Sequence, residues 1–222
     1  MREHATLAIF DHDGVLVDSF ALHQEAWLEL GRRAGLPITP KFIHKTFGMT
    51  NPSILRELLG AQITPDEIAR YSDQKEICYR DLARGEITLM AGVRELLDRL
   101  TELGVALAIG SSGPRANLDL TVQECGLEGR FAAIASLEDV VHGKPDPQVF
   151  LVAAHRSGVA PERSVVFEDA PVGILAAKAA GMLAVAVLTS HEPPPLIAAG
   201  ADLVVAGMGE LDVDALVTRL RS

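Results

Sequence analysis

The sequence has few cysteines and no long apolar run. Two cysteines in 222 residues, Cys78 and Cys125, cannot form a disulfide framework and do not stand in a metal-binding cluster, so we expect reduced thiols in a cytoplasmic protein. The apolar stretch before Asp11 is too short for the core of a signal peptide, and no run approaches the length of a membrane span. These absences predict a soluble protein without a membrane partner.

Basic residues are also in the minority, with 20 Lys and Arg against 30 Asp and Glu, which gives a formal net charge of −10 at pH 7. An excess of negative charge repels a phosphate backbone, so we expect no nucleic-acid partner. The hydrophobic fraction of 48% excludes a disordered chain, and 222 residues suffice for one or two domains with a packed core. A local basic pocket for one small phosphate group stays compatible with this charge.

Short apolar runs without alternation predict strands that are covered on both faces, as in a parallel sheet. Helical patterns that end at glycine lie between these runs. The alternation over residues 88–222 predicts an open α/β sheet with helices on both faces. The expected strands are Leu7–Phe10, Val105–Ile109, Phe131–Ala135, Val165–Phe167, Leu183–Leu188 and Leu203–Val205, and the expected helices are Val93–Leu103, Asn117–Cys125, Gln148–Ser157 and Val172–Ala180.

Residues 17–87 break this rhythm and contain helix signals only. Asp18 or Ser19 can cap a first helix, and Asn51 before a proline offers a second cap. Thr64 and Glu67 have the spacing of a capping box. We therefore expect an all-helical domain at 17–87, inserted after the first strand of a core formed by residues 1–16 and 88–222. The prolines at 193–195 are interpreted as a short rigid stop.

Reactive side chains follow four of the expected strands, at the edge where open parallel sheets bind ligands. Together they supply carboxylates for a hard divalent cation, hydroxyl donors and one positive charge, which suits a phosphoryl group with Mg²⁺. In chain order these residues are Asp11, Asp13, Ser111, Ser112, Lys144, Glu168 and Asp169.

Each of these residues also has a purely structural interpretation. Asp13 before Gly14 is a common turn dipeptide, and Glu168 with Asp169 can answer the dipole of the next helix. Ser111 can cap a helix, and Lys144 can be a solvated loop residue. In a catalytic interpretation, one of the two carboxylates at positions i and i+2, Asp11 and Asp13, acts as nucleophile or metal ligand and the other acts as general acid/base.

Four motifs resemble those of the haloacid dehalogenase superfamily, in its β-phosphoglucomutase-like branch. They are Phe10–Ser19, Ile109–Ser112, Gly143–Pro147 and Val166–Ile174, and their order and spacing cover nearly the whole chain. The resemblance implies a Rossmann-like parallel-sheet core with an inserted all-helical cap domain. It also implies an enzyme, a Mg²⁺-dependent phosphatase that hydrolyses a small phosphorylated metabolite (a sugar phosphate or similar) through an aspartyl-phosphate.

The resemblance also implies roles for single residues. Asp11 would attack phosphorus, and Asp13 would protonate the leaving oxygen and then activate water. Ser111 and Lys144 would hold the transferring phosphoryl group. The implied metal ligands are Asp11, Asp13 through its carbonyl oxygen, and Asp169, supported by Glu168, and the expected substrate-binding residues are Gly14, Ser112, Arg115, His23 and Asn51.

The cap segment and the segment after Ser111 depart from the mutase pattern of this branch, which has cationic residues for a second phosphate. Phe47, Asn51 and Pro114 stand at those positions, with Arg115 next to the last. Hydrolysis is therefore favoured, a β-phosphoglucomutase-type phosphotransferase is the alternative, and a non-catalytic phospho-ligand-binding protein is a more distant one. His23 shares a helix face with Trp27, and each is either a core residue or a substrate contact. We expect a monomer or weak dimer.

Overall fold

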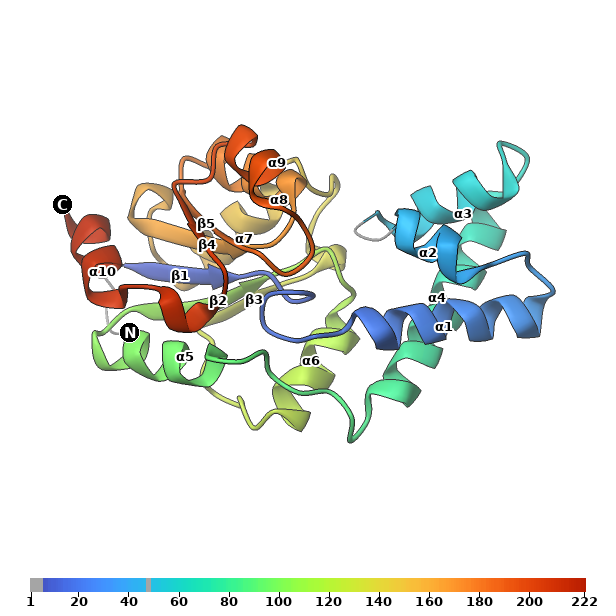
Figure 1. The fold of residues 1–222 in the computed structure, drawn as a ribbon, viewed down its shortest axis with the longest axis horizontal. Helices are drawn as coiled ribbons and strands as arrows, with labels where there is room; N and C mark the ends of the chain where they lie inside the picture. Colours follow the sequence, from blue (N-terminus) through green and yellow to red (C-terminus); the bar gives the residue numbers. More distant parts are fainter. Residues whose placement is uncertain (1–5, 47–48) are drawn as a thin grey trace. The chain divides into compact units, whose positions relative to one another are not determined.

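The computed structural model describes residues 6–46 and 49–222, so Phe47 and Gly48 lie outside the described residues. The chain divides into two compact units (Figure 1). The first, here called the core unit, comprises Met1–Asp18 and Thr88–Ser222. The second, the helical unit, is the intervening segment Ser19–Ile87.

A six-stranded parallel sheet forms the centre of the core unit, in the order β3-β2-β1-β4-β5-β6. The chain runs outward from β1 to β3 and then crosses to β4, so the direction of the connections reverses between β1 and β4. Such a reversal opens a crevice at the carboxyl ends of the two strands. The strands are β1 (Leu7–Phe10), β2 (Ala106–Gly110), β3 (Ala133–Ala135), β4 (Ser164–Glu168), β5 (Leu183–Val187) and β6 (Leu203–Val205).

Helices cover both faces of this sheet, which confirms the predicted α/β class. Figure 1 shows α7, α8 and α9 on one face and α5, α6 and α10 on the other. The helices are α5 (Val93–Glu102), α6 (Arg115–Glu124), α7 (Gln148–Ser157), α8 (Pro171–Ala179), α9 (Pro193–Ala198) and α10 (Val213–Arg221), with short 3₁₀ turns at Leu137–Asp139, Pro161–Arg163 and Met208–Glu210.

The helical unit contains α1 (Phe20–Ala34), α2 (Pro40–Thr46), α3 (Asn51–Leu59) and α4 (Pro65–Ala83). Its core gathers apolar side chains from all four helices around Trp27, which is 3% exposed. The core interpretation of Trp27 is thereby confirmed.

Of the three predicted helix caps, the one at Thr64 is confirmed, the one at Ser19 is confirmed in position only, and the one at Asn51 is wrong. Thr64 caps α4 in a complete capping box with Glu67, whereas Ser19 occupies the N-cap position of α1 without a capping side-chain bond. Asn51 does not cap α3. Thr50 does, because its hydroxyl accepts from the backbone N–H of Ser53, and Asn51 becomes the first helical residue.

The prolines at 193–195 are not a mere stop, because they form the first turn of α9. The first N–H groups of a helix have no intrahelical acceptor, and proline has a backbone angle that suits a helix. Consecutive prolines are therefore tolerated at this position alone within a helix.

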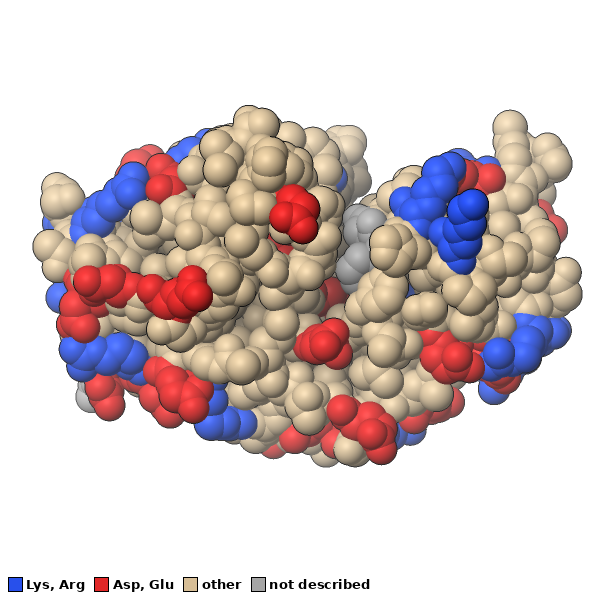
Figure 2. All heavy atoms as spheres, in the orientation of Figure 1, with Lys and Arg blue, Asp and Glu red and all other residues tan. Residues whose placement is uncertain are grey.

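Charged side chains of both signs alternate on the surface, and Figure 2 shows Lys and Arg among Asp and Glu on the face drawn. Many form ion pairs, such as Arg32 with Glu25 and Glu29, or Arg99 with Asp214. None of the described helices combines the length and the apolarity that crossing a membrane requires.

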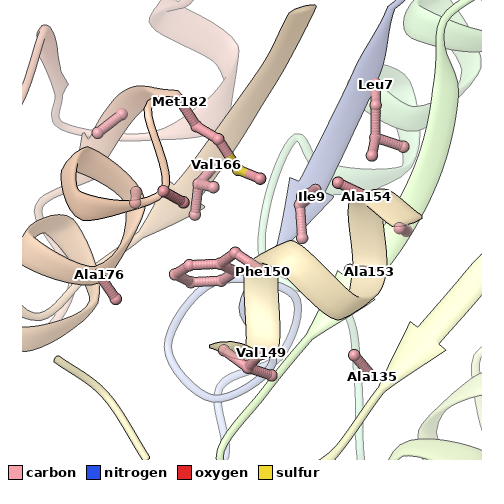
Figure 3. Packing of buried hydrophobic residues seen from close by; sticks show 14 of the residues in the cluster. Leu7, Ile9, Ala135, Val149, Phe150, Ala153, Ala154, Val166, Ala176 and Met182 are labelled. Atoms are coloured by element: carbon pink, nitrogen blue, oxygen red, sulfur yellow. The ribbon is translucent and has the colours of Figure 1, made fainter. Parts of the chain in front are cut away.

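Aromatic rings fix the two central strands from opposite faces. On one face Phe150 of α7 lies fully buried in a cluster with Ile9, Val166 and Met182 (Figure 3). Phe10 and Phe167 are direct neighbours across β1 and β4, and their rings stack with centroids 4.7 Å apart. Full burial of one such ring contributes on the order of 2–3 kcal/mol. The carboxyl ends of β1 and β4 are thus held by packing before any polar contact is considered.

Replacement of the capping threonine of α4 tests the helical unit. We expect Thr64→Ala to lower the free energy of unfolding by about 1 kcal/mol, because the N–H of Glu67 loses its acceptor. Thr64→Ser keeps the hydroxyl and should stay within about 0.5 kcal/mol of the parent. Urea unfolding followed by circular dichroism measures both, and equal losses for the two variants would contradict a capping role.

Candidate active site

Lys144 joins the carboxyl ends of β1 and β4. Its ammonium group donates to Asp11 Oδ1 at 2.8 Å and to Glu168 Oε1 at 2.6 Å. The three side chains are between 1% and 12% exposed. The centroid of the Phe150 ring lies 4.8 Å from the ammonium nitrogen of Lys144. The structure therefore brings together three of the predicted site residues, from three separate strand ends.

Glu168 is held at both of its oxygens. Oε1 accepts from Lys144, and Oε2 accepts from the backbone N–H groups of Asp169 and Ala170 at 2.8 Å each. The first turn of α8 leaves room for this carboxylate only because residue 173 is glycine, since a Cβ built there would lie 1.8 Å from Oε1. Glu168 thus orients its neighbours and has little freedom of its own.

Asp169 is held by a loop that the sequence analysis overlooked. Ser190 donates a short hydrogen bond to Asp169 Oδ2, and Thr189 Oγ1 lies 3.3 Å from the same oxygen. His191 Nδ1 lies 3.1 Å from the carbonyl oxygen of Asp169. These three residues follow β5, so the strand-end rule that selected the other site residues could have selected them too.

Gly14 lies against this loop with a left-handed backbone. Its φ is +76°, and a Cβ built there would lie 2.1 Å from Asp169 Oδ2. Thr189 Oγ1 donates to the carbonyl oxygen of Gly14 at 2.6 Å. Both the backbone angle and the close approach favour glycine at this position. The predicted contact of Gly14 with substrate stays a prediction.

The cluster carries more negative charge than one lysine neutralises. Burial and the charges of Glu168 and Asp13 raise the pKa of Asp11 to about 6, although Lys144 opposes the shift. Burial and the charges of Glu168 and Asp11 raise the pKa of Asp169 to about 8. Burial alone would lower the pKa of Lys144, but the two carboxylates outweigh it and raise that pKa above its usual range. A cation bound here would relieve this repulsion.

The donor set fits a divalent cation. Asp11, Glu168 and Asp169 each offer a carboxylate oxygen, and the three oxygens lie within 4.8 Å of one another. Oxygen donors of this kind suit Mg²⁺, which the haloacid dehalogenase resemblance implies. Because both oxygens of Glu168 already accept hydrogen bonds, Asp11 and Asp169 are the better direct ligands. The carbonyl oxygen of Asp13 stays a predicted ligand.

The loop after β2 lies close to Asp13. A Cβ built on Gly113 would lie 3.3 Å from Ser111 Oγ and 3.9 Å from Asp13 Oδ2. Ser111 does not cap α6, since Pro114 occupies the N-cap position and Ser111 Oγ accepts from the N–H of Gly113 at 3.0 Å. Ser111 is 2% exposed and lies at the strand end, where the motif analysis places it.

The other predicted substrate contacts lie outside this cluster. Ser112 is exposed, and the guanidinium group of Arg115 pairs with Asp119 along α6 at 2.7 Å. Neither residue has a described contact with the carboxylates. Their role in binding stays a prediction.

In the helical unit, His23 and Asn51 contact a buried ion pair that the sequence analysis missed. Lys75, 3% exposed, donates to His23 Nδ1 at 2.6 Å and to Glu76 Oε1 at 2.9 Å, and Asn51 donates to Glu76 at 2.8 Å. Burial raises the pKa of Glu76, but Lys75, His23 and the bond from Asn51 outweigh it and hold that pKa below its usual value. Lys75 lies seven residues after Ile68, and this spacing places both residues on the buried face of α4. The spacing in the sequence could therefore have predicted that Lys75 is buried.

Substitution of Gly173 tests the position of Glu168, because the sign of the change in stability shows whether a methyl group fits there. Alanine ordinarily stabilises a helix relative to glycine by up to about 1 kcal/mol. We expect Gly173→Ala to destabilise the protein by about 1–3 kcal/mol instead, because the new methyl group overlaps Glu168. Gly209→Ala is the matched control, since a Cβ there meets nothing within 4 Å. Thermal unfolding measures both, and a stabilising Gly173→Ala would contradict the described position of Glu168.

Comparisons with known proteins identify the family of the chain. The family described as haloacid dehalogenase-like hydrolase matches residues 8–187. Validoxylamine A 7'-phosphate phosphatase of Streptomyces hygroscopicus subsp. limoneus is 32% identical over 216 residues, which cover 92% of this chain and 95% of that protein. Beta-phosphoglucomutase of Bacillus subtilis (strain 168) is 31% identical over 216 residues, 94% of this chain and 92% of that protein.

Among solved structures, CbbY from Rhodobacter sphaeroides in complex with phosphate matches with a TM-score of 0.83 and 27% identity, over 94% of this chain and 96% of that chain. With a family match over most of its length and relatives above 30% identity, the chain belongs to the haloacid dehalogenase-like hydrolases, in the β-phosphoglucomutase/CbbY-like branch, and is an enzyme of the phosphatase and hydrolase type.

Proposed function

We propose that this enzyme hydrolyses phosphate monoesters of small, sugar-like metabolites, with Asp11 as the nucleophile. The observation that carries the proposal is the cluster of Asp11, Lys144, Glu168 and Asp169 at the carboxyl ends of β1 and β4. A relative that is named as the phosphatase of a phosphorylated compound, and a matching structure that holds phosphate, support this substrate class.

In the first half of the reaction, an oxygen of Asp11 attacks phosphorus while the bond from phosphorus to the leaving oxygen breaks. Asp13 gives its proton to that oxygen, so the product leaves as a neutral alcohol. Lys144 already contacts Asp11 Oδ1, and its charge offsets the negative charge of the phosphoryl group as it approaches. Ser111 would donate its hydroxyl to a phosphoryl oxygen.

In the second half, water attacks the phosphorus of the aspartyl-phosphate. The water proton passes to Asp13, the bond between phosphorus and the Asp11 oxygen breaks, and inorganic phosphate leaves. Asp13 is thereby protonated again, and Asp11 returns as a carboxylate. One residue thus acts as acid and then as base, two positions along the chain from the nucleophile.

Mg²⁺ would be held by Asp11 and Asp169, with Glu168 orienting Asp169 through its backbone N–H. When bound, the ion supplies charge neutralisation for the phosphoryl oxygens during transfer. Ser190 and Thr189 fix the Asp169 oxygen that faces Gly14, so this ligand is oriented before the ion arrives.

Hydrolysis is favoured over transfer of phosphate within a sugar. A mutase has to bind the second phosphate of a bisphosphate, for which bidentate arginine contacts are particularly strong. Here Pro114 occupies the N-cap position of α6, Arg115 pairs with Asp119, and Asn51 donates to Glu76. His23 and Asn51 stay proposed substrate contacts, and Lys75 and Glu76 position them.

Replacement of the nucleophile tests the proposal. We expect Asp11→Asn to lower kcat by more than about 10⁴-fold, because the amide cannot form the covalent intermediate. The measurement is release of inorganic phosphate from sugar and glycerol monophosphates, with no bisphosphate added. Asp146→Asn is the control, since the Asp146 side chain accepts from the backbone N–H of Gln148 and sits in the same loop as Lys144.

Retention of activity within about tenfold of the parent in Asp11→Asn would contradict the nucleophile. Isomerisation of β-glucose 1-phosphate that outpaces phosphate release, or a requirement for a sugar bisphosphate, would replace the phosphatase by the mutase alternative.

Metal binding can be measured apart from turnover. We expect Mg²⁺ to bind in a calorimeter and Asp169→Asn to weaken its affinity by at least about tenfold, since Mg²⁺ prefers charged oxygen ligands. Removal of the metal with a chelator should abolish phosphate release, and Mg²⁺ should restore it. Asp214→Asn, at an exposed carboxylate that pairs with Arg99, should leave the affinity unchanged. Full turnover in excess chelator would refute the metal site.

A further inference from the structure

A histidine stands between the two aspartates of the first motif, and its ring is buried. His12 is 1% exposed, whereas the side chain of Asp13 is 29% exposed. Ring nitrogen Nε2 lies 2.7 Å from Thr121 Oγ1. The other nitrogen, Nδ1, lies 3.1 Å from Asp13 Oδ1. The imidazole thus connects a fixed part of the core to the proposed acid.

The ring is anchored on both sides. Thr121 lies on the buried face of α6 and is fully buried, so its hydroxyl has a fixed position. The backbone of His12 is fixed as well, because its carbonyl oxygen accepts from the N–H groups of Leu16 and Val17 at 3.0 and 3.2 Å. Nδ1 is therefore a stationary polar atom beside a carboxylate that is itself partly open to solvent.

The contact distinguishes the two oxygens of Asp13. Oδ1 faces Nδ1 of His12, while Oδ2 lies toward Gly113 and the loop that carries Ser111. If the Thr121 hydroxyl donates to Nε2, a neutral ring carries its proton on Nδ1 and presents it to Oδ1. Oδ2 then keeps the proton of the acid on the side where Ser111 would hold the phosphoryl group.

We propose that His12 is a positioning residue, whose imidazole, anchored by Thr121, holds Asp13 in the orientation from which it protonates the leaving oxygen. The inference rests on the proposed function, because it assumes that Asp13 is the general acid. The competing interpretation is a core histidine that needs only its bond to Thr121. The two interpretations differ in which ring nitrogen matters.

Two amide substitutions separate the nitrogens. Asparagine places its amide about where Nδ1 lies, next to Asp13, and glutamine reaches to about the position of Nε2, next to Thr121. His12→Asn therefore keeps a donor for Asp13, and His12→Gln keeps the contact with Thr121. Neither change adds a charge or opens a large cavity.

The experiment measures how kcat/KM depends on the leaving group of the substrate. The nitrophenolate of p-nitrophenyl phosphate leaves without protonation, whereas the alkoxide of glycerol 1-phosphate or glucose 6-phosphate needs the proton of Asp13. The kcat/KM value reports steps up to the first chemical transfer, so the ratio of alkyl to aryl kcat/KM isolates the acid from the later action of Asp13 on water. Asp13→Asn gives the size of the full effect on this ratio.

We expect His12→Gln to lower the ratio by about 10-fold or more, part of the 10²–10⁴-fold that a general acid typically contributes. His12→Asn should keep the ratio within about threefold of the parent. Thr121→Val, which removes only the anchor, should lower the ratio as well, while Thr121→Ser should restore it. Circular dichroism and thermal unfolding show that each variant is folded.

An equal loss on both substrates in His12→Gln, or a loss of the ratio in His12→Asn but not in His12→Gln, would overturn the proposal. If the His12 variants fail to fold, an unchanged ratio in Thr121→Val overturns it instead. Failure of the proposed function is a separate result, since the parent enzyme would then release phosphate from neither class of substrate.

Discussion

The buried ammonium group of Lys144 is the interaction on which the rest of the site depends. Carboxylates at two neighbouring strand ends would repel one another in a low-dielectric environment, and each would be costly to bury alone. Lys144 contacts both Asp11 and Glu168, so its charge stabilises the two carboxylates side by side at the carboxyl ends of β1 and β4. It does not neutralise the set, because Asp169 adds a third carboxylate within reach of the same space. This excess of negative charge suits a cation, which in the proposed reaction offsets the charge of the phosphoryl group.

Both units of the chain bury a lysine, and the difference between the two sites is informative. In the helical unit, Lys75 has one carboxylate, Glu76, and an imidazole, His23, so charge is nearly balanced within the cluster. In the core unit, Lys144 faces an excess of carboxylates. An excess of carboxylates, unlike a balanced cluster, is the pattern that suits a bound cation. Because backbone N–H groups and close glycines hold the core cluster in place, little rearrangement is needed when a ligand enters.

The sheet and its reactive edge could be predicted because both depend on local patterns. Continuous apolar runs located every strand, and the residues after them located Asp11, Lys144 and Glu168. Contacts between distant residues could not be read in this way. The bond from Ser190 to Asp169 joins two loops, and the burial of Lys75 depends on which face of α4 packs against its neighbours. The predicted cap of α3 was wrong by one residue, because Thr50 and Asn51 are adjacent and both have side chains that can accept from the first N–H groups of a helix.

The order of the strands has a consequence for synthesis on the ribosome. Leu7 of β1 pairs with Ala106 of β2 and with Ser164 of β4, so the first strand to be made waits for both of its neighbours. The helical unit is continuous in sequence, and its helices can pack while the later strands are still being translated. Until then β1 is an apolar segment without strand partners, which chaperones can bind and which can aggregate with other nascent chains. The strand that leads directly into the proposed nucleophile is therefore also a segment that needs protection during translation.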